Sequence, residues 1–345
     1  MSSVESAILP TREMQTDLVH FLTCSKIVCN SGYIYSWINP NHPGFVYPEA
    51  MGLYLTLVSQ LSLQRNYRYL AEQAHAVANS LQHLTSPLGG IGKNEKLYLF
   101  DTCMAVNGLL TYKKYLNGYV NPTVVADMSR FIMKMAQQRL AVVADNGSLL
   151  EIQPHWSSVF GASMLKTVIA LDALAVETGE HYFSNLALEI AEEVVRECYS
   201  DGVFHVFPET TIVYCHAHCY ALEGLLYLHS RGYLEATELL SAGAQSLQKW
   251  QNSDGSLFNW YNAPSRELCK VCDATAQALR IWIAVDRDRF AEAINKGFTF
   301  LLSLRSPDFG LYYCDRSLDV NSWASIFATQ AMDWSLNGVQ SDCIV

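Results

Sequence analysis

Six short segments of the chain carry side chains capable of acid–base chemistry, and most of them also carry an aromatic residue. In chain order they are Tyr47-Pro48-Glu49, Phe100-Asp101-Thr102, His155-Trp156-Ser157, His216-Ala217-His218, Cys272-Asp273 and Asn321-Ser322-Trp323. Carboxylates and imidazoles transfer protons when their surroundings tune their pKa values, and they also hold hydroxyl groups. Aromatic rings offer faces on which the C–H groups of a sugar stack. The combination predicts a carbohydrate site, provided that the six segments meet in space.

Helix capping explains part of this pattern more simply. Asp101, Ser157, Asp273 and Asn321 are residue types favoured at the N-cap of a helix. Capping does not explain why a glutamate and imidazoles stand at the equivalent places of other segments, or why aromatic residues lie nearby. The predicted catalytic residues are Glu49, Asp101, His155, His216, His218 and Asp273. The predicted substrate contacts are Tyr47, Trp156, Trp260, Tyr261, Tyr313, Arg316, Asn321 and Trp323.

His216 and His218 point about 200° apart on an ideal helix, so only one of them is expected to face the interior. His218 is followed by an inward-facing apolar run, and we expect it to be the central acid–base residue. His216 is expected to donate a hydrogen bond to the substrate. If the preceding segment stays extended, both side chains can reach the site, because alternate residues of a strand share a face.

The elements that position these segments repeat with a nearly constant period. Glycine-centred turns recur at Gly32, Gly90, Gly147, Gly202, Gly255 and Gly310, at spacings of 58, 57, 55, 53 and 55 residues. Some of these turns contain an Asp-Gly or Asn-Gly step, which supplies the positive φ of a tight turn. The alternating aromatic residues that follow suit a short strand. A repeat of this length decides the whole fold.

Two helices are predicted in each period. The first helix is amphipathic with a charged face, which suits a half-solvated outer position. These helices are predicted over 13–28, 67–84, 122–141, 181–199, 234–251 and 288–304. The second helix is rich in small and apolar residues nearly all round, which indicates burial. These helices are predicted over 48–63, 100–116, 157–177, 215–230, 273–286 and 322–336.

Alternating outer and inner helices predict an all-α (α/α)6 toroid of six helical hairpins with short β-turn strands at one end. An open solenoid would need polar capping repeats, whereas the last inner helix here is as apolar as the others. No linker rich in Pro, Gly or Ser divides the chain, so residues 1–345 are expected to form one domain. The strands and the N-termini of the inner helices then gather at one end of the ring with the six chemical segments.

Composition limits the partners and the compartment. Half of the residues are apolar and 16% are charged, with a net charge of −10 and no run of Lys or Arg. Nucleic acid and anionic membranes are therefore not expected as partners. Residues 1–14 lack the pattern of a signal peptide, and the most apolar segment, 159–176, is interrupted by Lys166 and Asp172 and too short to span a bilayer. We expect a cytoplasmic protein with reduced thiols and, without a phosphate loop or dinucleotide fingerprint, no cofactor.

The cysteines allow a competing interpretation. Cys215 and Cys219 flank the two histidines, and Cys269 and Cys272 form a C-x-x-C step at the start of the next inner helix. Thiolates and imidazoles at such spacing suit zinc. A single C-x-x-C step is also common by chance in a Cys-rich chain, and thiols packed between helices are the favoured account. No metal is predicted.

On its repeat pattern and inner-helix segments, the chain resembles the six-hairpin glycosidase superfamily and the related N-acylglucosamine 2-epimerase-like toroids. The resemblance covers roughly the whole chain without a diagnostic signature. It implies an (α/α)6 barrel that acts on a sugar, often a uronic acid or an amino sugar. Asp101 is placed like the catalytic Asp of unsaturated glucuronyl hydrolases, and His216 and His218 are similar to epimerase acid–base histidines. Lanthionine cyclases and protein prenyltransferase β-subunits share this toroid class and carry zinc, although their usual signatures are missing here.

The predicted function is general acid–base catalysis on a uronic-acid or amino-sugar unit of a poly- or oligosaccharide. Hydrolysis, lyase chemistry and epimerisation stay open, because hydrolysis needs two suitably separated carboxylates and epimerisation needs two bases on opposite faces of one carbon. A zinc-dependent toroid enzyme is one alternative. A non-catalytic toroid that binds a polysaccharide or a protein is another, and it would need aromatic residues but no acid–base pair with shifted pKa values.

Overall fold

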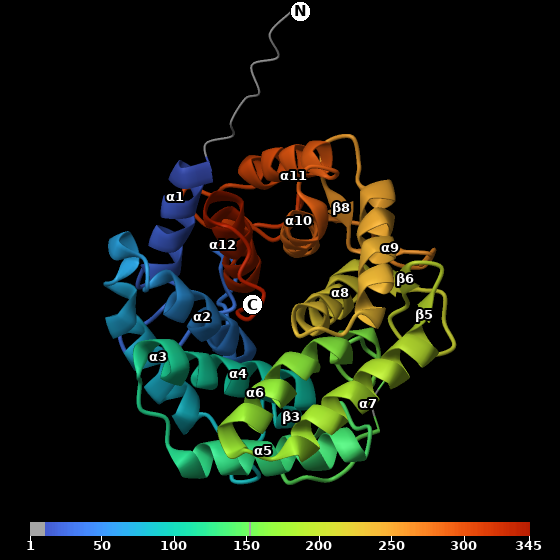
Figure 1. Cartoon of the computed structure of the whole chain (residues 1–345). Coiled ribbons are helices and arrows are strands. Elements are labelled where there is room, and N and C mark those ends of the chain that lie inside the picture. Colours follow the sequence, from blue (N-terminus) through green and yellow to red (C-terminus); the bar gives the residue numbers. More distant parts are fainter. Residues whose placement is uncertain (1–10, 152) are drawn as a thin grey trace, which may run out of the picture.

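The computed structural model describes residues 11–151 and 153–345. Within these ranges the chain forms twelve α-helices in two concentric rings (Figure 1). The outer helices are α1 (Thr11–Thr23), α3 (Leu70–His83), α5 (Pro122–Gln137), α7 (His181–Cys198), α9 (Glu235–Trp250) and α11 (Ala291–Ser303). The inner helices are α2 (Pro48–Leu61), α4 (Leu99–Leu116), α6 (Val168–Thr178), α8 (Cys215–Ser230), α10 (Cys272–Asp286) and α12 (Ser322–Asn337). The (α/α)6 toroid predicted from the period is confirmed.

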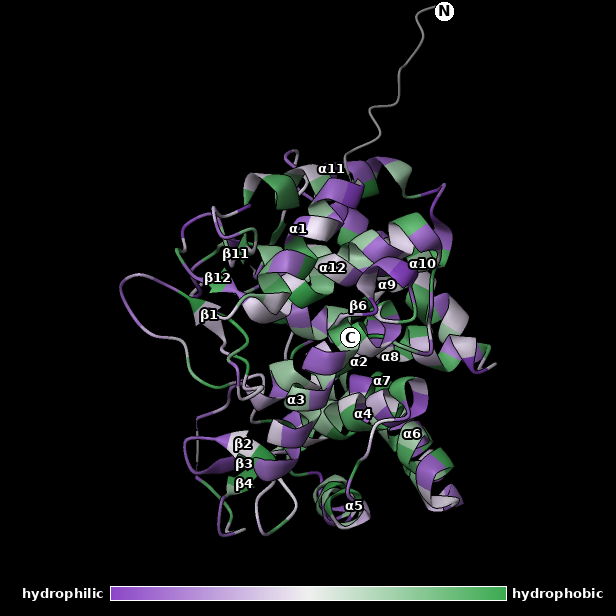
Figure 2. Ribbon diagram, turned by 90° about the vertical axis from the view of Figure 1, so that its left-hand side faces the viewer, coloured by the Kyte–Doolittle hydropathy of each residue, from purple (hydrophilic) through white to green (hydrophobic). Residues whose placement is uncertain are grey.

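Inner helices are buried along most of their length because they have no continuous polar face, whereas hydrophilic and hydrophobic residues alternate along the outer ones (Figure 2). Small residues let α2 and α4 approach closely. A Cβ at Gly52 would lie 2.3 Å from the carbonyl oxygen of Met104, and one at Gly108 would lie 2.3 Å from that of Gly52. A larger residue at either glycine would force the two helices apart.

The first and last repeats join to close the ring. Strand β1 (Trp37–Ile38) pairs antiparallel with β12 (Val320–Asn321), which also pairs with β11 (Leu311–Tyr312). Helix α12 packs against both α1 and α2, and Gln15 Nε2 donates a hydrogen bond to Asp333 Oδ1 at 3.0 Å. The predicted closure is confirmed, because an open superhelix would hold these segments apart.

Short strands gather at one end of the ring, and several of them appear on the left in Figure 2. The remaining strands are β2 (Ile91–Lys93), β3 (Lys96–Tyr98), β4 (Val142–Ala144), β5 (Tyr199–Ser200), β6 (Val203–Phe204), β7 (Val213–Tyr214), β8 (Leu257–Phe258), β9 (Trp260–Tyr261) and β10 (Lys270–Val271). They pair as β2–β3–β4, β5–β6, β7–β9 and β8–β10. Strands β3, β7, β10 and β12 run directly into inner helices. Sheet hydrogen bonds therefore hold the first residues of those helices in place.

The third inner helix, predicted over 157–177, becomes α-helical only at Val168, after the 3-10 helix η2 (Ala162–Thr167). The backbone at Gly161 is extended, and a Cβ there would lie 2.4 Å from the carbonyl oxygen of Val206. The chain thus passes too close to the next repeat to enter a helix earlier. Ser157 consequently lies in a turn and caps no helix.

Two of the six predicted turns place the left-handed residue one position before the predicted glycine. Gly89 has φ of 86° in the second turn and Phe309 has φ of 69° in the sixth. Gly310 is required for a different reason, because a Cβ there would lie 2.6 Å from the side chain of Val320 and 2.7 Å from that of Phe21. Close packing, and not a positive φ, therefore explains that glycine.

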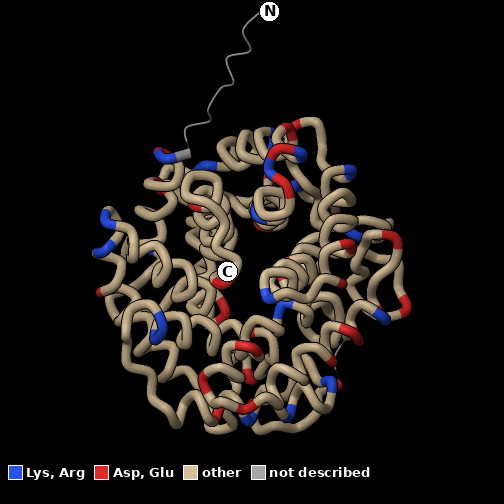
Figure 3. Tube along the Cα trace, in the orientation of Figure 1, with Lys and Arg blue, Asp and Glu red and all other residues tan. Residues whose placement is uncertain are grey.

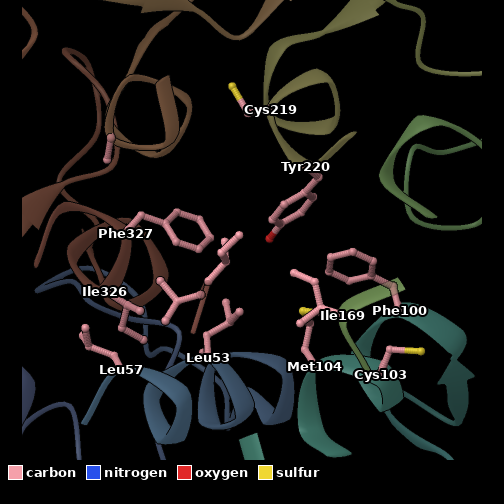
Figure 4. Packing of buried hydrophobic residues seen from close by; sticks show 14 of the residues in the cluster. Leu53, Leu57, Phe100, Cys103, Met104, Ile169, Cys219, Tyr220, Ile326 and Phe327 are labelled. Atoms are coloured by element: carbon pink, nitrogen blue, oxygen red, sulfur yellow. The ribbon is translucent and has the colours of Figure 1, made fainter. Parts of the chain in front are cut away.

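Charged residues lie mainly around the outside of the ring, although a few lie inside it (Figure 3). Lys166, Glu223 and Arg280 are fully buried. They lie beside the aromatic side chains that meet at the axis, where Tyr220 from α8 and Phe327 from α12 converge (Figure 4). Buried charges persist only when they are paired, and Glu223 pairs with both Lys166 and Arg280. No helix in the described ranges is long and apolar enough to cross a membrane.

Candidate active site

A cavity of about 290 Å³ opens at the strand end of the ring. It is lined by Tyr47, Glu49, Lys93, Lys96, Tyr98, Asp101, Gln153, His155, Trp156, Ser157 and Ser158. The starts of α2 and α4 supply the two carboxyl groups, the β2–β3 hairpin supplies the lysines, and the loop before η2 supplies the imidazole and the indole. Five predicted site residues are brought together here, namely Tyr47, Glu49, Asp101, His155 and Trp156.

Glu49, the second residue of α2, is 3% exposed and accepts two hydrogen bonds. The hydroxyl of Tyr47 donates to Oε2, and the hydroxyl of Tyr220 donates to Oε1 at 3.0 Å. Burial raises the pKa of Glu49, and the hydrogen bond from Tyr47, the charge of Lys93 and the hydrogen bond from Tyr220 oppose that rise. Donors to a carboxylate stabilise its ionised form, so Glu49 is equipped to carry a negative charge.

Asp101, the third residue of α4, shares this cavity and is 6% exposed. Burial, followed by the negative charge of Glu49, raises the pKa of Asp101 well above its usual range, and the charge of Lys93 opposes the rise. Two carboxyl groups in one site do not both ionise readily. Because Glu49 has the two tyrosine donors, Asp101 is the group better suited to hold a proton at neutral pH.

Lys93 and Lys96 lie directly opposite each other in the β2–β3 hairpin, and like charges at such positions destabilise a strand pair. Lys93 Nζ lies 4.4 Å from the ring centroid of Phe45 and 4.5 Å from that of Tyr47. None of the lysine ion pairs among the described residues involves either side chain. The hairpin therefore presents positive charge that an anionic group could neutralise.

His155 and Trp156 lie at the mouth of the cavity, in the loop before η2. The Nδ1 atom of His155 is 3.0 Å from the hydroxyl oxygen of Ser157. Partial burial, with the charges of Arg266 and Lys93, lowers the pKa of His155. The indole of Trp156 contacts the ring of His216 edge to face, with centroids 5.5 Å apart, and so links the cavity wall to the residues behind it.

His216 lies behind Trp156 and is 4% exposed. Its Nδ1 atom is 2.6 Å from Gln277 Oε1 and 3.6 Å from Asp273 Oδ2. Burial lowers the pKa of His216 to about 3 and raises that of Asp273 to about 6. The imidazole is therefore uncharged at neutral pH, and its contact with Asp273 is not an ion pair.

Aromatic residues extend this group to both sides. Trp323 Nε1 donates to Asp273 Oδ2 at 3.4 Å, and its ring packs against Tyr47 and Tyr313 at centroid distances of 5.4 and 5.9 Å. On the other side, the ring of Trp260 lies 4.4 Å from that of Tyr214. Asp273, Tyr313, Trp323 and Trp260 thus adjoin the cavity through their neighbours without lining it.

His218 is not brought to this site, so the expectation that it faces the interior is wrong. Its ring is fully buried against Trp250 of α9, with centroids 5.3 Å apart, and its Nδ1 accepts the N–H of Phe204 at 3.1 Å. It points towards the outer layer because residues two apart on a helix differ by about 200°. Burial lowers the pKa of His218 to about 3, and its position gives it a structural role.

Three further predicted contacts have other partners and do not line the cavity. Tyr261 stacks on Trp250 with centroids 4.5 Å apart. Asn321 caps α12 through its side-chain oxygen, as its residue type also indicated. Arg316 is exposed and lies 3.4 Å from Glu267. The simpler capping interpretation therefore holds for Asn321.

Comparisons with known proteins find similarity in structure alone. No family model and no curated protein sequence matches the chain. An unsaturated glucuronyl hydrolase specific for heparin matches with a TM-score of 0.73 and 10% identity, over 95% of this chain and 98% of its own. A sugar epimerase from a ruminal bacterium matches with a TM-score of 0.74 and 12% identity, over 96% and 100%. A cellobiose 2-epimerase from Bacillus thermoamylovorans matches with a TM-score of 0.74 and 10% identity, over 94% and 98%.

This chain has the fold of the six-hairpin glycosidase superfamily. The resemblance predicted from the repeat is therefore confirmed for the fold. Structural similarity at 10 to 12% sequence identity shows the fold alone.

The residues of this site that were not among the predicted catalytic residues and substrate contacts include Lys93, Lys96, Tyr220 and Gln277. Tyr220 follows His216 by four residues, and that spacing places both on one face of α8. The lysines flank the two turn residues Asn94 and Glu95, and Asn is a residue type that tolerates the positive φ of a hairpin turn. Gln277 has no comparable signal, because nothing in the sequence distinguishes it from the other polar residues of the inner helices.

The ten cysteines are free thiols, and seven of them are buried. Burial raises the pKa of Cys103, Cys219 and Cys272. Among the residues that the structure describes, no group of three or more His, Cys, Asp or Glu side chains is placed to hold a metal ion. The zinc alternative therefore lacks a donor set in that part of the chain.

Proposed function

We propose that this protein is a carbohydrate-active enzyme that acts on a uronic-acid unit of an oligo- or polysaccharide by general acid–base catalysis. The observation that carries the proposal is the pair of buried carboxyl groups, Glu49 and Asp101, in one cavity walled by Tyr47 and Trp156. Solved hydrolases and epimerases of saccharides with the same fold support it. A binding module would have no need of a carboxyl pair with raised pKa values.

Hydrolysis has the most support among the possible reactions. Environments that separate the pKa values of two carboxyl groups assign one as acid and the other as base or nucleophile. Asp101, whose pKa is raised most, would protonate the leaving oxygen. Glu49, held by Tyr47 and Tyr220, would activate water or attack the anomeric carbon.

Epimerisation is the second candidate, because His216 places one uncharged imidazole beside the cavity wall. A two-base reaction would have to draw its second base from Glu49, Asp101 or His155, since the side chain of His218 points away from the cavity, towards the outer layer. Hydrolysis requires no such combination of unlike groups, and we rank it first.

The lysine pair favours an acidic sugar over an amino sugar. Lys93 and Lys96 would attract the carboxylate of a uronic acid and repel a protonated amine. Residues 1–345 are proposed to act as one domain. The cytoplasm is the proposed compartment, supported by ten free thiols, which persist where the surroundings are reducing.

A substrate panel tests the proposal. Unsaturated uronyl disaccharides, the same disaccharides with the carboxylate esterified, and cellobiose are incubated with the purified protein, and products are identified by mass spectrometry and NMR. Release of a monosaccharide from the acidic disaccharide alone is the expected result. Conversion of cellobiose to its C2 epimer would establish the second candidate, and binding without turnover of any of these sugars would contradict catalysis.

A further inference from the structure

A line of buried polar groups runs from the axis of the ring to His216. Glu223 is fully buried, its Oε2 lies 2.7 Å from Lys166 Nζ, and its Oε1 is paired with Arg280 Nη2. The same Oε1 accepts a hydrogen bond from Gln277 Nε2 at 3.1 Å. Gln277 Oε1 lies 2.6 Å from His216 Nδ1. Two cations thus hold a carboxylate in place, and one amide connects it to the imidazole.

The carboxylate decides which way this amide faces. An ionised carboxylate only accepts hydrogen bonds, so the NH2 of Gln277 must point to Glu223 and its oxygen must point to His216. That oxygen accepts and cannot donate, so the Nδ1 atom of His216 must carry the hydrogen. A neutral imidazole has a single N–H, so the Nε2 atom keeps its lone pair.

We propose that Glu223, acting through Gln277, fixes His216 as the Nδ1–H tautomer, so that Nε2 stays an acceptor beside the cavity wall. Glu223 and Gln277 are then positioning residues. This reverses the role expected from the sequence, in which His216 donates a hydrogen bond to the substrate. The inference rests on the proposed function only for its ligand, which is a sugar hydroxyl that donates to Nε2.

The surroundings of His216 agree with an uncharged ring. Lys166 and Arg280 oppose protonation by their positive charge, and Asp273, 3.6 Å from Nδ1, faces the same nitrogen as Gln277. On its other sides the imidazole packs against Trp156 and Tyr220, whose ring centroids lie 5.5 and 4.2 Å away. No described residue forms a hydrogen bond with Nε2, in contrast to the two acceptors that face Nδ1.

The tautomer can be read in the free protein, without any substrate. Protein labelled with ¹⁵N-histidine is studied by long-range ¹H–¹⁵N correlation, and the His216 signals are identified by their loss in His216→Gln. We expect one protonated nitrogen, Nδ1, and one unprotonated nitrogen, Nε2, at pH 7. A ring protonated at Nε2, or at both nitrogens, would overturn the proposal.

Two variants and a matched control separate positioning from packing. Gln277→Leu should turn the single tautomer into a mixture. Gln277→Glu should keep the Nδ1–H tautomer, because one proton shared between its carboxyl group and Glu223 leaves an oxygen that accepts from Nδ1. Gln330→Leu removes another buried amide, which binds Arg280 at 2.8 Å, and should leave the tautomer of His216 unchanged. An unchanged tautomer in Gln277→Leu, or an equal change in Gln330→Leu, would contradict the proposal. If Gln277→Leu fails to fold by circular dichroism, the spectra of the native protein and of Gln277→Glu decide.

Kinetics with the saccharide found in the substrate panel give an independent readout. Gln277→Leu should lower kcat about 10-fold or more with little change in KM, the scale on which partners of functional histidines act. An unchanged kcat would remove His216 from the reaction. If no saccharide is turned over, the proposed function fails. The tautomer of His216 is still tested by NMR, because that measurement needs no substrate.

Discussion

The ring has a cavity at each end, and the two differ in charge pairing more than in size. The cavity at the strand end measures about 290 Å³, and the one at the opposite end, lined by residues of α4, α6 and α8, measures about 450 Å³. In the larger cavity the charges neutralise one another, in the pairs Lys113–Glu177 at 2.5 Å, Lys114–Asp342 at 3.2 Å and Arg231–Asp172 at 3.1 Å. In the smaller one, two carboxyl groups are buried together opposite two unpaired lysines.

This difference favours the smaller cavity as the proposed active site. Groups with strongly shifted pKa values cluster at functional sites, where they are kept despite their cost in stability. Paired surface charges contribute little to stability. Cavity volume alone would have favoured the opposite end of the ring.

The largest expected effect distinguishes the carboxyl groups of the two cavities. Asp101→Asn and Glu49→Gln should each lower the rate on the uronyl disaccharide by about 10²- to 10⁴-fold, since each removes one acid–base group. Asp172→Asn, in the larger cavity, should leave the rate within about twofold. Initial rates of the purified variants check this, and an equal loss in Asp172→Asn would mean that the larger cavity takes part in the reaction.

The second effect concerns stability, and its sign follows from the raised pKa of Asp273. Burial raises that pKa from 3.8 to about 6, so the folded state binds more protons than the unfolded state between about pH 4 and pH 6. Stability therefore falls as the pH rises through this window, by up to roughly 3 kcal/mol. Asp273→Asn should abolish that fall and be more stable than the native protein at pH 7. Urea unfolding from pH 3.5 to 7.5 measures it, and parallel pH profiles for the two proteins would contradict the expectation.

The third effect compares lysines of the two cavities. Lys93→Met should raise KM for the acidic disaccharide by about 10- to 100-fold, the loss of a hydrogen bond to a charged group. It should also move the acid limb of the pH–rate profile to higher pH, because Lys93 lowers the pKa of Glu49 and Asp101. Lys113→Met should change neither quantity. A KM effect without the shift of the acid limb would confine Lys93 to substrate binding.

The smallest expected effect is on the stability of the other end of the ring, at Asp342. Its dependence on pH has the opposite sign to that of Asp273. Partial burial of Asp342 is outweighed by hydrogen bonds from Tyr115 and Lys114, which lower its pKa. Stability from this carboxylate is therefore present above its ordinary pKa and is lost as the pH falls through the lowered value. Asp342→Asn should be less stable than the native protein at pH 7, by less than about 1 kcal/mol. The difference should vanish in acid, and the same urea series measures it. An Asp342→Asn protein that is more stable than the native protein at pH 7 would contradict the expectation.

The period of the glycine turns and the apolar inner helices were enough to predict the closed ring and the end at which polar residues meet. These features are local, because a helix without a polar face must be buried, and six such helices bury one another only in a ring. For the same reason Glu49 and Asp101 could be assigned to a shared site. Each begins an inner helix, and the starts of neighbouring inner helices lie side by side.

Which side chains complete the site was decided by tertiary packing. His216 and His218 are equivalent in sequence pattern, and only the position of α8 between α9 and the axis turns one towards Trp156 and the other towards Phe204. Gln277 became a partner of His216 because α10 lies beside α8. The rotation of a helix about its own axis depends on every neighbour that it contacts. The sequence alone therefore determined the ring and its polar end, whereas the direction of each side chain there was set by packing across the ring.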